Sequence, residues 1–274
     1  MSISKSGTPV TSKAIRRIIL QQAMRAHVGH IGSALSVADI LTAVFGGRTH
    51  SPGITAGDPD RDDRFVLSKG HAALALYAVL RLQGKLDQAT LDTYCGDGSL
   101  LGVHPEKELP GVEFSAGSLG QGLGVATGAA LAKRIKKNPG RVRVLISDAE
   151  LNEGSTWEAI MFAAHRKLAN LDVIVDLNGQ QALGKTRDVI DLEPLAPRWR
   201  AFGWEVRQVD GHDPEAMVTA MRAMAASQDM PQVLLARTVS GKGVGYMEGQ
   251  VKWHYWPMSE ADYAAAMAEL EAAA

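Results

Sequence analysis

Residues 142–180 read VRVLISDAELNEGSTWEAIMFAAHRKLANLDVIVDLNGQ, and this stretch decides the fold. Two apolar runs, 142–146 and 173–177, have the length of buried strands, and the segment at about 156–168 between them has the length of a helix. A strand, a helix and a second strand in this order form a right-handed unit with parallel strands. The core is therefore expected to be a parallel sheet covered by helices.

The same alternation extends through the rest of the chain. The other predicted strands are 64–68, 205–209 and 233–236. The other predicted helices are 12–27, 36–45, 72–83, a run that follows the glycines at 117–124 and ends at about 136, 194–202, 214–226 and 259–274. A loop rich in Pro, Gly and Asp is predicted at 51–63. This pattern predicts one doubly wound α/β domain over residues 1–274, with a mostly parallel sheet, helices on both faces and a long helical N-terminal segment.

Some helix starts show a Ser followed three residues later by an acidic residue, the pattern of an N-terminal cap. The three pairs are Ser36 with Asp39, Ser155 with Glu158, and Ser259 with Asp262. Each is expected to begin a helix.

Composition narrows the class of protein. The chain has 274 residues, 46% of them hydrophobic, which suits a large folded core. Lys and Arg number 29 against 30 for Asp and Glu, so no concentrated basic charge favours nucleic acid as the main partner. With a single cysteine, Cys95, an internal disulfide is impossible and a reducing cytoplasm is the expected compartment. No apolar run approaches 18 residues, which argues against secretion or a membrane span.

Polar residues follow two neighbouring strands of the predicted sheet. Asp148 comes directly after one strand and Asn178 directly after the next. Because ligands bind at the carboxyl ends of parallel strands, these oxygens could hold Mg²⁺ or Ca²⁺ together with a diphosphate. The alternative is local: Asp148 caps the following turn, and Asn178 makes an Asx turn before Gly179. Spacing alone leaves both readings open.

A glycine cluster, GSLGQGLG at 117–124, precedes a helix but has no clear strand before it, so a dinucleotide site of the NAD type is poorly supported. Gly120, Gly124 and Gly128 recur every four residues and would leave one helix face without side chains. That face suits close packing, either inside the chain or against a second copy.

Four histidines lie in separate loops: His30, His71 and His104 stand beside glycine or proline, and His254 follows the glycine turn at 241–243. Any one of them alone would suit a structural role, but together they suggest a shared site that handles protons and anionic oxygens. The other histidines, His27, His50, His165 and His212, lack that setting and are assigned no role.

These pieces occur in ordered segments: 29–32, 64–80, 104–106, 117–124, 151–159 (LNEGSTWEA), 170–181 (NLDVIVDLNGQQ), 203–213 (GWEVRQVDGHD) and 241–243. Together they resemble the N-terminal, thiamin-diphosphate-binding half of transketolase over nearly the whole chain. The resemblance implies the thiamin-diphosphate-binding fold and a single diphosphate-binding domain, with the family's pyrimidine-binding and C-terminal domains absent.

Residue roles follow from the resemblance by position. It implies Asp148, Asn178 and the backbone carbonyl of Gln180 as Mg²⁺ ligands, with Ca²⁺ as a possible substitute. The implied cofactor-lining residues are His71, Gly117, Ser118, Leu119, Ala149, Asn178 and His254. His30 and His104 would face the two-carbon unit of the substrate. Glu153 resembles the family's buried carboxylate that links paired active sites, and Glu158 is attributed to the helix cap instead.

Two departures from the family pattern lie close to these residues. The thiamin motif usually begins Gly-Asp-Gly but here reads Ser147-Asp148-Ala149. A Cβ at Ala149 narrows the approach to a diphosphate and would cost roughly 1–2 kcal/mol if the backbone there had positive φ. Ala116 also stands where a Thr is common.

The resemblance implies one subunit of a split transketolase, because full-length relatives continue into the two further domains. With a partner carrying the pyrimidine-binding domain, it would transfer a two-carbon ketol unit from a ketose or its phosphate to an aldose, as a heterotetramer with two copies of each subunit. One alternative is the equivalent subunit of a 2-oxo acid decarboxylating enzyme. Another is a non-catalytic scaffold that has lost the cofactor.

Overall fold

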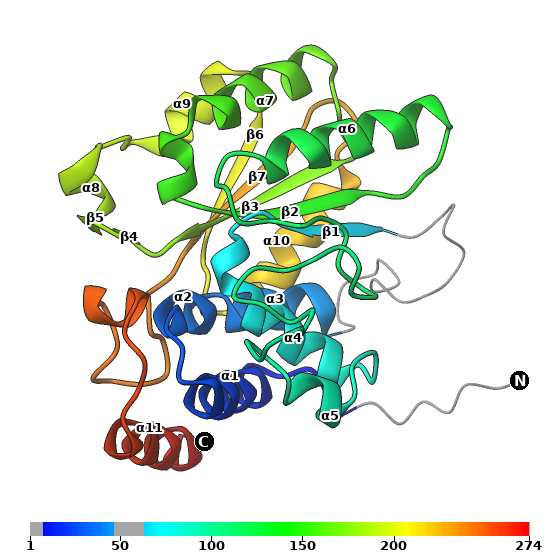
Figure 1. The fold of residues 1–274 in the computed structure, drawn as a ribbon. Helices are drawn as coiled ribbons and strands as arrows, with labels where there is room; N and C mark the ends of the chain where they lie inside the picture. Colours follow the sequence, from blue (N-terminus) through cyan, green and yellow to red (C-terminus); the bar gives the residue numbers. More distant parts are fainter. Residues whose placement is uncertain (1–7, 47–62, 274) are drawn as a thin grey trace, which may run out of the picture.

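The computed structural model of the chain describes residues 8–46 and 63–273. Within them, a parallel sheet has the strand order β1-β2-β3-β7-β6 (Figure 1). Its strands are β1 Arg64–Leu67, β2 Val142–Ser147, β3 Leu171–Leu177, β6 Glu205–Asp210 and β7 Gln232–Arg237. A short antiparallel hairpin, β4 Gln180–Gln181 and β5 Gly184–Lys185, follows β3. The predicted doubly wound α/β fold with a mostly parallel sheet is confirmed.

Helices cover both faces of this sheet (Figure 1). The α-helices are α1 Ser12–Ala26, α2 Ile31–Ser36, α3 Ala38–Phe45, α4 Ala73–Leu82, α5 Gln88–Leu91, α6 Gly122–Ile135, α7 Gly154–His165, α8 Thr186–Val189, α9 Leu195–Ala201, α10 Pro214–Ala226 and α11 Glu260–Ala272. Short 3₁₀ turns are η1 Gly70–Ala72, η2 Ala149–Asn152 and η3 Val251–His254. None of the helices in the described part of the chain is long and apolar enough to span a bilayer.

Alternate residues of each strand supply two separate cores. In β3, Ile174 packs into the core formed with α1–α4 and α10, whereas Val173 and Val175 pack into the core formed with α6, α7 and α9. Successive side chains of a strand point to opposite faces, so a strand buried on both sides must be apolar at nearly every position. This is why β2 and β3 are mostly apolar, with Arg143, Asp172 and Asp176 as charged exceptions.

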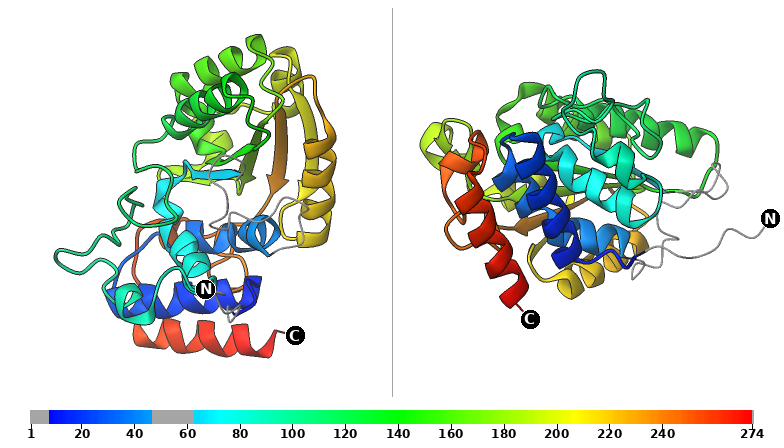
Figure 2. Two further views of the ribbon diagram at one scale, coloured as in Figure 1. Left: turned by 90° about the vertical axis from the view of Figure 1, so that its right-hand side faces the viewer. Right: turned by 60° about the horizontal axis from the view of Figure 1, so that its bottom comes forward.

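The first and last helices lie side by side, as both views in Figure 2 show. The Lys13 ammonium group donates a 2.6 Å hydrogen bond to the carbonyl of Ala273, and Arg17 pairs with Glu271. The capping box predicted at the start of α11 is present, with Ser259 and Asp262 bonding each other's backbone N–H groups. α1 and α11 thus lie on the outer side of α2–α4, farther from the sheet (Figure 1).

Two predicted helix caps are wrong. Ser36 ends α2 and donates its hydroxyl to Asp176, while Asp39 binds Arg16 and His212 instead of capping a helix. Ser155 donates to the carbonyl of Gly120, and α7 begins two residues earlier than expected, at Gly154. In each case a tertiary partner competes successfully for the capping side chain. The loop prediction at 51–63 falls, apart from Asp63, outside the described residues.

Candidate functional site

A cavity of about 400 Å³ opens at the carboxyl edge of β2 and β3. In the sheet, Ser147 at the end of β2 is in register with Asp176 near the end of β3, so the residues that follow the two strands share one edge, as predicted. The cavity is lined by His30, Ser33, His71, His104, Gly117, Leu119, Ser147, Ala149, Asn152, Glu153, Asn178, Gln180, Gln181, Ala182, His254 and Tyr255. Seven segments, most of them loops or helix ends and several far apart in the sequence, therefore meet in one place.

The four predicted histidines form one cluster in this cavity. The ring centroid of His30 lies 5.3 Å from that of His254, 5.7 Å from that of His71 and 6.4 Å from that of His104. Their predicted juxtaposition is confirmed, while their individual roles stay predictions. Of the histidines given no role, His212 bonds Asp39 and the amide of Val239, and His50 lies outside the described residues.

His30 owes its position to an unusual backbone. Its φ of 61° and ψ of 20° lie in the left-handed region, which side-chain-bearing residues seldom adopt. The N–H of His30 donates a 3.0 Å hydrogen bond to the carbonyl of His254, which holds the segment against η3. A Cβ on the preceding Gly29 would lie 2.1 Å from the carbonyl oxygen of Tyr255, so this close approach requires glycine. The contact fixes the His30 ring in the cavity.

Three imidazoles of the cluster are neutral near pH 7. Burial, followed by the charge of His104, lowers the pKa of His30. Burial, followed by Lys69, lowers the pKa of His71 well below its usual value, and burial with His30 lowers the pKa of His254 to about 4. A neutral imidazole can donate from one nitrogen and accept at the other. Among the described residues, buried His30 Nδ1 has no hydrogen-bond partner, so it is free to bind a ligand in the cavity.

Asp148 and Asn178 make the local hydrogen bonds that a turn cap and an Asx turn would need. Asp148 accepts from the amides of Ala149 at 2.9 Å and Gly179 at 2.7 Å, and Asn178 Oδ1 accepts from the amide of Gln180 at 2.9 Å. These bonds do not exclude a cation, because a carboxylate or amide oxygen has a further lone pair. They also preform the loop that would carry the ligands.

The charges around these residues fit a divalent cation. Burial, followed by the charge of Asp176, raises the pKa of Asp148 to about 7, and burial raises the pKa of Glu150. Against these three buried carboxylates stands one buried ammonium group, that of Lys69, which pairs with Asp176. Buried anions in excess favour a bound cation. Within residues 8–46 and 63–273, no three His, Cys, Asp or Glu side chains converge as a metal site by themselves, so the cation would also need the Asn178 amide oxygen and a backbone carbonyl.

The backbone around the cavity also accommodates a diphosphate. Ala149 begins the 3₁₀ turn η2 and is absent from the residues with positive φ, so the strain considered for an alanine here does not arise. Gly117 and Leu119 line the cavity, while the exposed Ser118 lies between them. A Cβ at Gly117 would stand 3.4 Å from His104 Cγ, so a side chain there would crowd the cluster.

Glu150 is one of the buried carboxylates of this region. It accepts from the hydroxyl of Ser68 and from the amides of Gly120 and Ser147, and its side chain has no exposed surface. Glu153 lines the cavity but is exposed in the single chain, so the burial expected of it is not met within this chain. Its predicted link to a paired site needs a second polypeptide.

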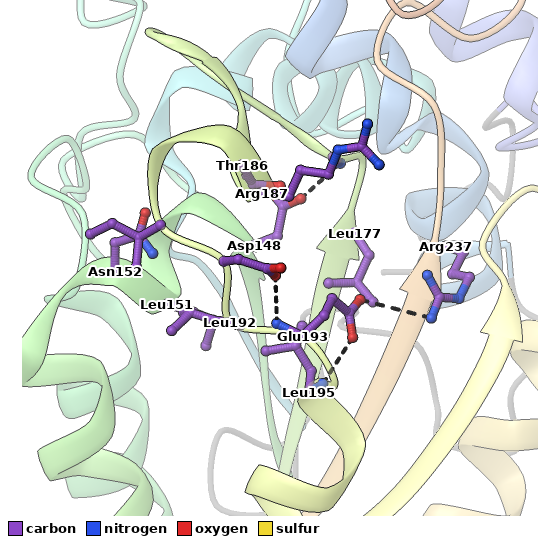
Figure 3. A pocket seen from close by; sticks show the side chains of 13 residues that line it. Asp148, Leu151, Asn152, Leu177, Thr186, Arg187, Leu192, Glu193, Leu195 and Arg237 are labelled. Carbon is purple, nitrogen blue, oxygen red and sulfur yellow. Dashed lines mark hydrogen bonds and ion pairs between the residues drawn. The ribbon is translucent and has the colours of Figure 1, made fainter.

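A smaller cavity of about 100 Å³ adjoins the first (Figure 3). Asp148 and Gly179 line it together with residues of α8 and the segment before α9, and Asn152 lines both cavities. Figure 3 shows Glu193 joined to Arg237 and to the amide of Leu195, which closes the far side of this smaller cavity. Asp148 and Asn178 thus line different cavities, bridged by the Gly179 loop.

The predicted glycine stripe is partly wrong. Gly120 lies before α6 with a φ of 84°, and a Cβ there would stand 2.7 Å from Glu153 Cβ. Gly124 and Gly128 do share an exposed face of α6, where an added Cβ would meet no atom within 4 Å. The stripe therefore makes no internal helix contact in the described part of the chain.

Three residues at the site escaped sequence reasoning. Asp176 and Lys69 form a fully buried ion pair beside Asn178, and Tyr255 packs its ring 4.7 Å from that of His254. A signal existed for the pair: an acidic residue inside the apolar run 171–177 must find a buried partner. No pattern in the sequence pointed to Tyr255.

The chain is similar in sequence to transketolases over nearly its whole length. The family described as "Transketolase, thiamine diphosphate binding domain" matches residues 9–272. The chain is 38% identical over 261 residues to the 6-deoxy-6-sulfo-D-fructose transketolase subunit SqwG of Clostridium sp. (strain MSTE9), with 95% of this chain and 94% of that protein covered. It is likewise 38% identical over 264 residues to an apulose-4-phosphate transketolase subunit of Phocaeicola vulgatus, covering 94% and 92%.

Among solved structures, a transketolase from Campylobacter jejuni superposes with a TM-score of 0.87 at 31% identity. The match covers 95% of this chain but only 42% of that one, so the chain spans less than half the length of this solved relative.

Proposed function

Because the chain belongs to the transketolase family through its thiamin-diphosphate-binding domain, we propose that it is a catalytic subunit that transfers a two-carbon ketol unit from a ketose or ketose phosphate to an aldose or its phosphate. The observation that carries the proposal is the cluster of four histidines around one cavity, beside the oxygen ligands at the ends of β2 and β3. When bound, thiamin diphosphate supplies a thiazolium carbon that adds to the donor carbonyl and stores the electron pair released by carbon–carbon cleavage.

In this proposal, Asp148, Asn178 and the carbonyl of Gln180 hold Mg²⁺, with Ca²⁺ as a possible substitute. Their support is the excess of buried carboxylates over buried cations at this edge of the sheet. His71, His254, Ala149 and the turn at 117–119 bind the cofactor's diphosphate end. A neutral imidazole suits this task because it still has one N–H group that can donate to a phosphate oxygen.

His30 and His104 act on the sugar. Charge develops on the sugar oxygens as the carbon–carbon bond breaks and forms, and fixed donors at those oxygens lower the barrier. His30 presents its unpartnered Nδ1 in the cavity, and the ring of His104 lies 6.4 Å away, a spacing that leaves room for a bound hydroxyl group. The rigid left-handed backbone at His30 keeps its donor in place before the substrate arrives.

The proposal includes a second polypeptide that carries the pyrimidine-binding domain, because both curated relatives are themselves named as transketolase subunits. Exposed apolar side chains support a partner that covers the mouth of the cavity. Leu183, Tyr255 and Trp256 are 81%, 56% and 61% exposed in the single chain. Self-association is proposed through the Gly124 and Gly128 face of α6, the heterotetramer having two copies of each subunit.

The test is an assay for ketol transfer with thiamin diphosphate, Mg²⁺, a ketose phosphate and an aldose phosphate. The purified chain alone should show no turnover, and the chain with its co-purified partner should show turnover. Robust turnover by the chain alone would contradict the split arrangement. If the complex binds no thiamin diphosphate in calorimetry, the chain is a scaffold and the catalytic proposal fails. The two relatives are named for different sugars, so a panel of ketose phosphates must identify the donor.

A further inference from the structure

Asp176 is a fully buried carboxylate that gathers four side chains from different elements. Its Oδ1 accepts from the hydroxyl of Thr238. Its Oδ2 accepts from Ser36 Oγ at 2.8 Å, from Lys69 Nζ at 2.5 Å and from Asn178 Nδ2 at 3.0 Å. The residue thereby joins β3 to α2, to the end of β1 and to the loop after β7.

Stability alone does not account for the buried ion pair of Asp176 with Lys69. Both side chains have no exposed surface, and taking two charges out of water costs about as much as their attraction returns. Well-packed apolar residues in their place are often neutral or stabilising, so a buried pair of this kind suits a positioning role better than a stabilising one. The position of the pair beside a proposed metal ligand suggests what it positions.

The hydrogen bond from Asn178 to Asp176 fixes which end of the amide faces the loop. A side-chain amide has one oxygen that can bind a cation and one NH₂ group that cannot. Because Nδ2 donates to Asp176, Oδ1 must point the other way, where it accepts from the amide of Gln180. The Gln180 amide also favours this orientation, but without an acceptor at Asp176 the Asn178 NH₂ group would lose its buried partner and the oxygen would be held by one bond only.

We propose that Asp176 and Lys69 are positioning residues for Asn178: the carboxylate holds the amide so that its oxygen is available to the metal, and the ammonium group balances the carboxylate. The charge balance matters because Asp176 is fully buried and lies next to the proposed ligand Asn178. With Lys69 in place, the pair contributes no net charge, and the metal interacts mainly with Asp148. This inference rests on the proposed function, since it needs a metal held by Asn178.

The experiment compares two paired replacements that leave the net charge unchanged. Lys69→Met with Asp176→Leu removes the acceptor for the Asn178 amide, whereas Lys69→Met with Asp176→Asn keeps an acceptor oxygen of nearly the same size. Binding of Mn²⁺ in the presence of thiamin diphosphate is measured by calorimetry and electron paramagnetic resonance on the full chain with its partner. Circular dichroism and thermal unfolding confirm that each variant is folded.

We expect the leucine pair to bind Mn²⁺ about 10–100-fold more weakly, the usual effect of losing an outer-shell partner. The asparagine pair should recover most of that affinity. Ser36→Ala, which removes a different bond to the same carboxylate oxygen, is the matched control and should leave the affinity within about 3-fold. If the leucine pair fails to fold, Lys69→Met with Asp176→Ala replaces it under the same criteria.

A double-mutant cycle with Asn178→Ala tests whether Asp176 changes the Mn²⁺ affinity through Asn178. If Asp176 acts through Asn178, adding the leucine pair to Asn178→Ala should weaken binding by less than about 3-fold further. Equal affinity in the leucine, asparagine and wild-type proteins would overturn the inference, as would full additivity with Asn178→Ala. A wild-type complex that binds neither Mn²⁺ nor thiamin diphosphate would instead overturn the proposed function, and the inference with it.

Discussion

Replacing Gly128 of α6 by alanine should raise the stability of the isolated chain while weakening its self-association. Gly128 lies inside the helix on its exposed face, and an added Cβ would meet no atom within 4 Å. The helix-propensity gain should therefore appear in full, at about 0.8–1.0 kcal/mol. For a urea m-value of about 3 kcal/mol/M, the unfolding midpoint should rise by about 0.3 M.

The second effect depends on protein concentration. If two copies pack through the glycine face of α6, a methyl group there keeps the helices apart. The wild-type midpoint should then rise with concentration by mass action, and the Gly128→Ala midpoint should not. Sedimentation of both proteins gives the association constants directly, and urea unfolding at several concentrations gives the stabilities.

A neighbouring glycine provides the control. A Cβ at Gly122 would lie 2.2 Å from Ser68 Oγ and 2.8 Å from Ser68 Cα, so Gly122→Ala should destabilise the chain by about 1–3 kcal/mol. A loss of stability in Gly128→Ala at low concentration would refute the argument that this face is free within the chain. Unchanged self-association in the same variant would show that the copies pair elsewhere.

Three further predictions concern the site. Asp148→Ala should fold normally, because it removes a desolvated carboxylate, but it should lose Mg²⁺-dependent binding of thiamin diphosphate. EDTA should release the cofactor from the wild-type complex. Near-native cofactor affinity in the variant would contradict the metal assignment. His30→Ala and His104→Ala should each lower turnover by about 10²-fold with little change in cofactor affinity, whereas His71→Ala should weaken cofactor binding. Steady-state kinetics measures the first effect and calorimetry the second. Full activity in His30→Ala and His104→Ala would leave these two histidines only structural roles. The pKa of His254 is lowered to about 4, so the folded state favours the neutral imidazole, and its contribution to stability should be lost as pH falls from 6.5 toward 4. The free energy of unfolding measured across this window should depend less on pH in His254→Gln than in the wild type. An NMR titration midpoint of His254 near 6.5 would contradict the burial argument.

Most of the sheet could be predicted because local composition carries the needed information. The strands predicted at 142–146 and 173–177 are present as β2 and β3 because both are mostly apolar on both faces, although β2 ends one residue later than predicted and β3 begins two residues earlier. The capping box of Ser259 and Asp262 formed as expected because α11 begins at an exposed position. At Ser36 and Ser155 the same local pattern failed, since buried acceptors at Asp176 and Gly120 compete for the hydroxyl groups.

At the site, sequence reasoning reached the residues whose neighbours along the chain are informative. Asp148 and Asn178 follow strands, and the four histidines lie in or beside glycine- or proline-containing loops that a family resemblance could align. The pairing of Lys69 with Asp176 joins residues more than a hundred positions apart, and no local rule connects them. Within the single chain Glu150 is buried and Glu153 is exposed, because burial depends on which side of η2 faces the sheet, while the role predicted for Glu153 stays a prediction.

The sequence by itself determined the fold class, the order of strands and helices along the chain, and which residue types gather at the strand ends, because these depend on hydrophobic periodicity and on the geometry of parallel units. Tertiary structure alone decided the strand order in space, the meeting of His30, His71, His104 and His254 in one cavity, and the direction in which the Asn178 amide points. The physical reason is that these features arise from contacts between segments distant in the chain, where packing and the pairing of buried charges outweigh local preference.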